Sequence, residues 1–158
     1  MTTLWIIASL FIVAIAFGVL AWRMAVAMRA RAQECELEEA RRTFHQRREW
    51  LEARFMTLAS RSGKPRGLAW VDCDFDDAVS FARDRATGQL RSLVGVTIRF
   101  RAVEGGGMED NPNVANLRAA TVVFHLADGQ WETDGRTLFN LNPAEAIRHF
   151  QHELDLVE

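Results

Sequence analysis

The sequence predicts an α+β protein: an N-terminal transmembrane helix that continues into a helical stalk, then an antiparallel sheet of five or six strands with a C-terminal helix packed on it. Three observations predict this class. The chain begins with a long uncharged apolar run, continues without Gly or Pro to residue 62, and alternates apolar with polar residues from about position 67 onward. Helices and half-buried strands bury side chains with different periods, so the change of period separates helix from sheet.

The first predicted element is a membrane anchor within residues 1–22. Leu4 to Trp22 is a run of 19 residues without a charge, and Ser9 is its only hydroxyl-bearing residue. As a helix it would extend about 28 Å, close to the hydrocarbon thickness of a bilayer. Trp5 and Trp22 lie near its two ends, where indole rings favour the headgroup layer, and Arg23 follows directly. We expect these three residues at the membrane interface.

The charges beside the anchor predict its orientation. No basic residue precedes it, whereas Arg23, Arg29 and Arg31 follow it closely. We expect the protein in the plasma membrane. The positive-inside rule then places its N-terminus outside the cell and its C-terminal domain in the cytoplasm. The only cysteines, Cys35 and Cys73, form no Cys-x-x-Cys pair, which agrees with a reducing compartment.

The net charge of -2 conceals an asymmetry along the chain. Residues 23–66 carry a net charge of +5, next to the predicted bilayer, and residues 67–158 carry -7. Basic residues beside a membrane are attracted to anionic lipids. An acidic domain lacks the basic surface that phosphate binding requires, so nucleic acid is not expected as a partner.

Residues 23–62 predict a juxtamembrane helix and a candidate weak coiled coil. Leu37, Phe44, Leu51 and Leu58 recur at intervals of seven, and Phe55 follows Leu51 by four. The second heptad position, three residues later, holds Ala40, Arg47 and Arg54. A two-stranded coiled coil needs apolar residues at both positions, so this one would be weak. The stripe could therefore join two copies of the chain, dock on the globular domain or meet the membrane surface.

Residues 67–158 predict a small α+β domain. Within 68–76, Ala69, Val71, Cys73 and Phe75 face one way and Trp70, Asp72, Asp74 and Asp76 the other. Further strands are predicted at 79–83, 93–103, 119–126, 130–133 and 137–140, with hairpin turns at 84–88 and 128–129. Residues 104–118 form a long connection.

The last predicted element is a helix with a marked start. Asn142 is the cap, Pro143 takes the first helical position and Glu145 completes a capping box. Ile147, Phe150 and Leu154 would form its buried stripe.

The candidate ligand-binding residues are Asp72, Asp74, Asp76 and His125 on the polar faces of two strands. A Ca²⁺ loop beginning at Asp72 is excluded, because its sixth position is Asp77 instead of Gly and its twelfth is Arg83 instead of Glu. No nucleophile or metal motif is present, so we expect no catalytic residue, metal or cofactor.

These patterns favour a single-pass membrane protein whose cytoplasmic domain works as a non-enzymatic interaction or scaffold module. Its expected partners are the lipid bilayer and another protein, or a second copy of itself through the stalk helix. The alternative is a membrane-tethered enzyme or small-ligand-binding domain that uses the concave face of the sheet. A cavity of at least about 300 Å³ with convergent polar groups would favour that alternative.

Overall fold

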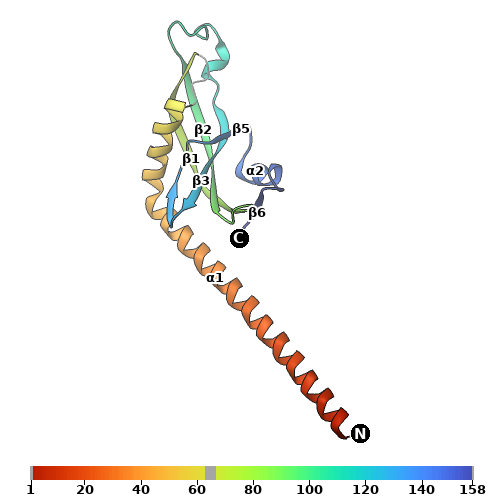
Figure 1. Ribbon diagram of the computed structural model, residues 1–158. Coiled ribbons are helices and arrows are strands. Elements are labelled where there is room, and N and C mark those ends of the chain that lie inside the picture. Colours follow the sequence, from red (N-terminus) through yellow and green to blue (C-terminus); the bar gives the residue numbers. More distant parts are fainter. Residues whose placement is uncertain (1, 63–66, 158) are drawn as a thin grey trace. The chain divides into compact units, whose positions relative to one another are not determined.

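The computed structural model describes the backbone of residues 2–62 and 67–157, and the side chains of residues 15–61 and 67–157. The chain forms two compact units, Met1–Arg41 and Arg42–Glu158. The predicted α+β class is confirmed: a long N-terminal helix precedes an antiparallel six-stranded sheet and a small C-terminal helix (Figure 1).

Helix α1 is continuous from Thr2 to Ser62. Its uninterrupted course agrees with the absence of Pro and the scarcity of Gly, and it ends just before Gly63, Lys64 and Pro65, which lie outside the described residues. Within the part of the chain that was described, no helix is long and apolar enough to cross a membrane. Most of the predicted anchor, residues 4–14 with Trp5, lies outside the residues whose side chains are described.

The sheet has the order β4-β3-β2-β1-β6. β5 also pairs with β3, at residues 120–122, whereas β4 pairs with residues 125–127 of that strand. Every pairing is antiparallel. The strands are β1 (Leu68–Asp84), β2 (Leu90–Ala102), β3 (Arg118–Ala127), β4 (Gln130–Glu132), β5 (Thr137–Phe139) and β6 (Leu154–Leu156).

The two strands predicted at 68–76 and 79–83 are a single strand, β1, interrupted by bulges. Its register against β2 shifts between Trp70 and Asp72 and again between Phe75 and Val79. An extra residue at a bulge reverses which face the following side chains take. Trp70, predicted on the polar face, therefore packs against Phe100 with ring centroids 5.1 Å apart, on the same face as Phe75.

The hairpin predicted at Asp128 and Gly129 is confirmed between β3 and β4. Both residues have positive φ, 48° and 75°. A type I′ turn requires this at its two central positions, and Asp and Gly tolerate it best.

Helix α2 (Pro143–His149) begins as predicted but is shorter. The Asn142 side chain accepts from the Glu145 N–H, and the Glu145 side chain accepts from the Asn142 N–H, which completes the capping box. The predicted stripe does not continue along the helix: Phe150 is the C-cap residue and Leu154 begins β6. The sequence predicted helix as far as residue 154, but the helix ends earlier because Leu154 pairs with Asp84 at the edge of β1.

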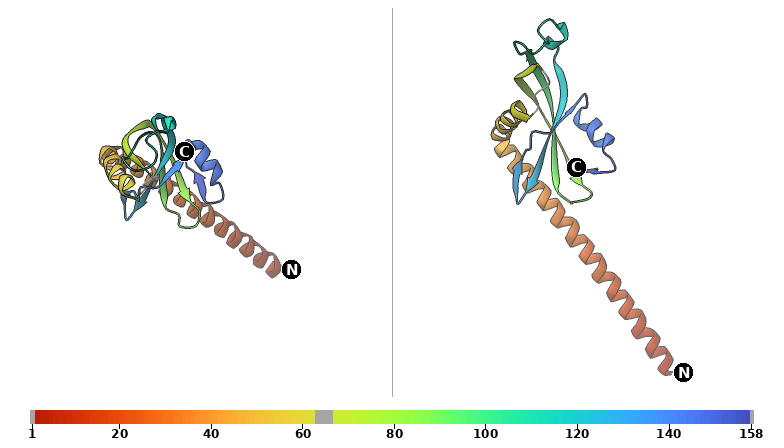
Figure 2. Two further views of the ribbon diagram at one scale, coloured as in Figure 1. Left: turned by 90° about the horizontal axis from the view of Figure 1, so that it is seen from above. Right: turned by 45° about the horizontal axis from the view of Figure 1, so that its top comes forward.

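The last part of α1, residues 42–62, covers one face of the sheet (Figure 2). Phe44 and Phe55 are 1% and 0% exposed. The Phe44 ring meets Phe81, Phe124 and Trp131 edge to face, with centroids 5.2 to 5.9 Å apart. Such pairs add about 0.5–1.5 kcal/mol each beyond the area that they bury. Of the three roles predicted for the stalk stripe, docking on the globular domain is observed for these two residues.

The opposite face of the sheet packs against α2 (Figure 1). This second cluster is smaller and aliphatic: Ala82, Leu93, Ala146, Ile147 and Leu154 are its buried members. β2 therefore has an apolar layer on each side over much of its length. Most of its side chains are buried, and those of Arg99 and Arg101 near its end are exposed.

The aromatic contacts of α1 predict a measurable loss of stability. Replacing Phe55 with Ala should lower the free energy of unfolding by about 3–5 kcal/mol, because it leaves a cavity beneath Trp70, Phe75 and Phe124. Trp50→Ala on the same helix is the matched control, since Trp50 is 54% exposed. Urea unfolding of the full chain in detergent, followed by circular dichroism, should show a change below about 1 kcal/mol for Trp50→Ala. Equal losses would contradict this account of the core.

Candidate functional site

The three predicted aspartates share one face of β1. Asp72 lies opposite Arg99 and Asp74 opposite Thr97 in the register of β1 and β2. The Asp76 carboxylate lies over Gly95, so close that even a methyl group at Gly95 would displace it. All three side chains are exposed and lie on the face opposite α1. The sequence thus predicted their common face.

His125 lies on the same face of the sheet but near its other end. It is opposite Arg91 in the register of β2 and β3. Arg91 and Arg99 are eight residues apart along β2, which corresponds to about 26 Å. The structure therefore separates His125 from Asp72 and Asp74, and the four candidates do not form one site.

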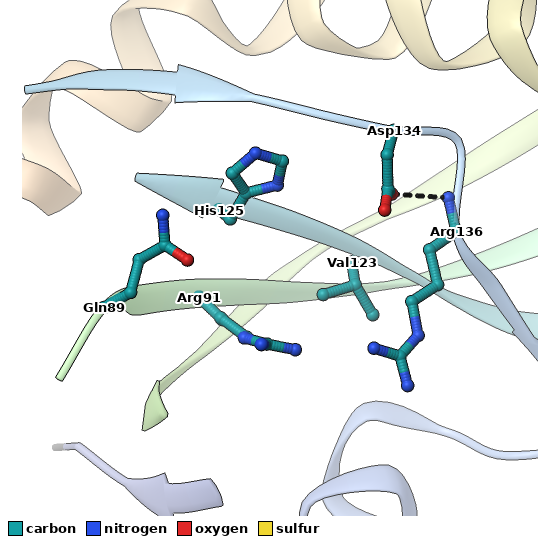
Figure 3. A pocket seen from close by; sticks show the side chains of 6 residues that line it. All are labelled: Gln89, Arg91, Val123, His125, Asp134 and Arg136. Atoms are coloured by element: carbon teal, nitrogen blue, oxygen red, sulfur yellow. Dashed lines mark hydrogen bonds between the residues drawn. The ribbon is translucent and has the colours of Figure 1, made fainter. Parts of the chain in front are cut away.

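A cavity of about 230 Å³ lies next to His125, on the side of the sheet opposite α1. Figure 3 shows the six side chains around it, from the start of β2, from β3 and from the segment that links β4 to β5. They are Gln89, Arg91, Val123, His125, Asp134 and Arg136. Sequence reasoning found His125 alone, because the other residues come together only through strand register.

The neighbouring Asp84 anchors Arg91. Its carboxylate accepts hydrogen bonds from the N–H groups of Ala86 and Thr87 in the β1–β2 turn, both at 3.0 Å. The Arg91 guanidinium donates to the same carboxylate at 2.5 Å. Hydrogen bonding from the Thr87 backbone, followed by the Thr87 side chain and the Arg91 charge, lowers the pKa of Asp84 despite its burial. Arg91 is thereby held at the floor of the cavity.

A second feature is the outer edge of β1. β6 covers that edge only at Ala82–Asp84. Nearer its middle, the Arg48 guanidinium donates to the carbonyls of Asp76 and Asp77 at 2.5 and 2.9 Å, where the bulge exposes them. Within the described chain, residues 71–75 have no strand partner on this side.

Two other predicted features bear on chemistry. Cys35 and Cys73 are both free, and burial, with the neighbouring Asp72 charge, raises the pKa of the Cys73 thiol to about 12. That thiol is protonated and unreactive at neutral pH. Among the described residues, no group of three His, Cys, Asp or Glu side chains is arranged to hold a metal ion.

Comparisons with models of known protein families, with curated protein sequences and with solved structures found no match for this chain.

The lowered pKa of Asp84 predicts a pH-dependent contribution to stability. A carboxyl whose folded-state pKa lies below its unfolded value stabilises the fold above the unfolded pKa of about 3.9, and loses this effect as pH falls through the folded pKa. Asp84→Asn should therefore lower the free energy of unfolding by about 1–3 kcal/mol at pH 7 and make it fall less between pH 5 and pH 2.

Urea unfolding of the full chain at several pH values measures this effect, with Asp110→Asn, at an exposed carboxylate, as control. A pH dependence in Asp84→Asn as steep as in the unsubstituted protein would contradict the assignment.

Proposed function

We propose that this protein is a membrane-tethered, non-enzymatic interaction module that binds a basic, extended segment of another protein along the outer edge of β1. The observation that carries the proposal is the open edge at residues 71–75. Its backbone N–H and C=O groups can pair with an added strand, as in other proteins that bind peptides by extending a sheet. Five residues match the usual length of a strand.

The side chains along this edge select the partner. Asp72 and Asp74 are exposed there, and Val71, the extra residue of the adjacent bulge, is 47% exposed. Two copies of the same edge would repel each other, whereas Lys and Arg side chains opposite them would attract. Acidic side chains on an edge also hinder self-association. These charges favour a basic partner over a second copy of this chain.

The tether is the apolar run Leu4–Trp22, proposed to span the plasma membrane with the N-terminus outside and the second unit in the cytoplasm. This part of the proposal is supported by the sequence: 19 uncharged residues, followed by Arg23, Arg29 and Arg31. A tether raises the effective concentration of the edge near other membrane proteins, so a weak contact suffices for binding.

A small-ligand-binding domain remains the second candidate function. The cavity beside His125 favours it, since its lining is mostly polar. At about 230 Å³ it is smaller than the roughly 300–1,000 Å³ of most ligand sites. We therefore rank this candidate below the interaction module.

Two charges placed in the middle of the tether should release the protein from membranes. Ile12→Arg with Ala16→Arg puts two guanidinium groups one helical turn apart in the bilayer, at a cost of about 2.5–3.5 kcal/mol each. Met24→Arg with Met28→Arg, beyond the apolar run, is the matched control. After an alkaline carbonate wash, the unsubstituted and control proteins should stay with the membranes and the first variant should not. Release of the unsubstituted protein would refute the anchor.

A photo-crosslinking amino acid at Val71 of the full chain should trap the partner in intact cells. The same group at Leu117, which is 57% exposed on the long connection, is the control. We expect one adduct from position 71 that position 117 does not give. Asp72→Lys with Asp74→Lys should remove it, because the charge complementarity is reversed. An adduct that survives this charge reversal, or none at position 71, would overturn the proposed partner surface.

A further inference from the structure

The cavity beside His125 is made by elements that are distant in sequence. Arg91 and His125 lie opposite each other on β2 and β3. The Val123 N–H donates to the Arg136 carbonyl at 3.2 Å, which ties the β4–β5 segment to the same strands. Asp134 accepts from the Arg136 N–H at 3.0 Å, the bond drawn in Figure 3. The cavity walls are thus fixed by backbone pairing.

One hydrogen-bond donor of a residue that lines this cavity is unused within the described chain. The Arg91 Nε is buried and has no hydrogen-bond partner there. A buried donor without a partner is unfavourable, and such groups in native proteins call for an explanation. The Gln89 side chain, in contrast, is already held by the Leu126 carbonyl at 2.9 Å.

The two guanidinium groups define the charge of the cavity. Those of Arg91 and Arg136 extend into the same part of it, below Val123, while the Asp134 carboxylate lies on the far side next to the Arg136 backbone (Figure 3). Asp84 binds Arg91 from outside the lining, and Arg136 is stacked on the Phe150 ring at 5.8 Å. The lining thus carries two guanidinium groups against one carboxylate, and this net positive charge favours an anion in the cavity.

We propose that this cavity binds the oxyanion group of a small molecule, a carboxylate or a phosphate, between Arg91 and Arg136. A planar guanidinium offers paired donors that match the oxygens of either group. The bound oxyanion would accept from guanidinium N–H groups of Arg91 and Arg136, and His125, which also lines the cavity, would contribute a further donor. The volume of about 230 Å³ admits the anion with only a few more atoms. This site does not depend on the partner surface proposed for β1.

Thermal unfolding of the full chain in detergent tests the site, with inorganic phosphate and acetate as probes and sodium chloride to hold the ionic strength constant. At about one hundred times its dissociation constant, a bound probe should raise the unfolding midpoint by roughly 5–10 °C, and the rise should saturate. A response to phosphate alone would assign a phosphate group, and a response to acetate a carboxylate.

Arg136→Gln should abolish the rise, measured from the variant's own midpoint without probe, because it removes one of the two guanidinium groups. Arg101→Gln, at an exposed arginine of β2 outside the cavity, should keep it. The proposal is overturned if neither probe gives a saturable rise, or if Arg136→Gln responds as the unsubstituted protein does.

Discussion

The packing of the α1 aromatic residues on the sheet is the interaction on which the second unit depends. Phe44 and Phe55 are almost fully buried, and their rings contact residues of β1, β3 and β4. Few other groups could cover that face, since α2 has only seven residues and lies on the opposite one. The helix predicted as a stalk is therefore also a layer of the core, and the fold of residues 67–157 includes the end of α1.

Two features of the second unit are open to a partner or a ligand. They are the outer edge of β1 at residues 71–75 and the cavity lined by residues of β3 and of the β4–β5 segment. Arg48 links α1 to the edge of β1. Its guanidinium donates to carbonyl groups at the β1 bulge and is paired with Glu52 at 2.7 Å. The same helix that completes the core thus also limits the open edge to residues 71–75.

Much of the fold could be predicted from local chemistry. The capping box at Asn142 and the Asp128–Gly129 turn involve neighbouring residues only, and both are confirmed. The predicted side of Trp70 and the predicted secondary structure of Leu154 were wrong, because contacts with residues distant in sequence decided both. A bulge turned Trp70 toward the core, and pairing with Asp84 placed Leu154 in a strand. Of the candidate site residues, the sequence indicated His125 but neither of the arginines in its cavity.

By itself, the sequence determined the α+β class, the position of the helices and most strands, and the common face of Asp72, Asp74 and Asp76. Periodicity and capping depend on residues a few positions apart, so they are visible in the chain. The tertiary structure alone decided that the α1 stripe covers the sheet, that β1 keeps an open edge, and that Arg91 and Arg136 share a cavity. These features depend on strand register and bulges, which are set by contacts between segments far apart in the sequence.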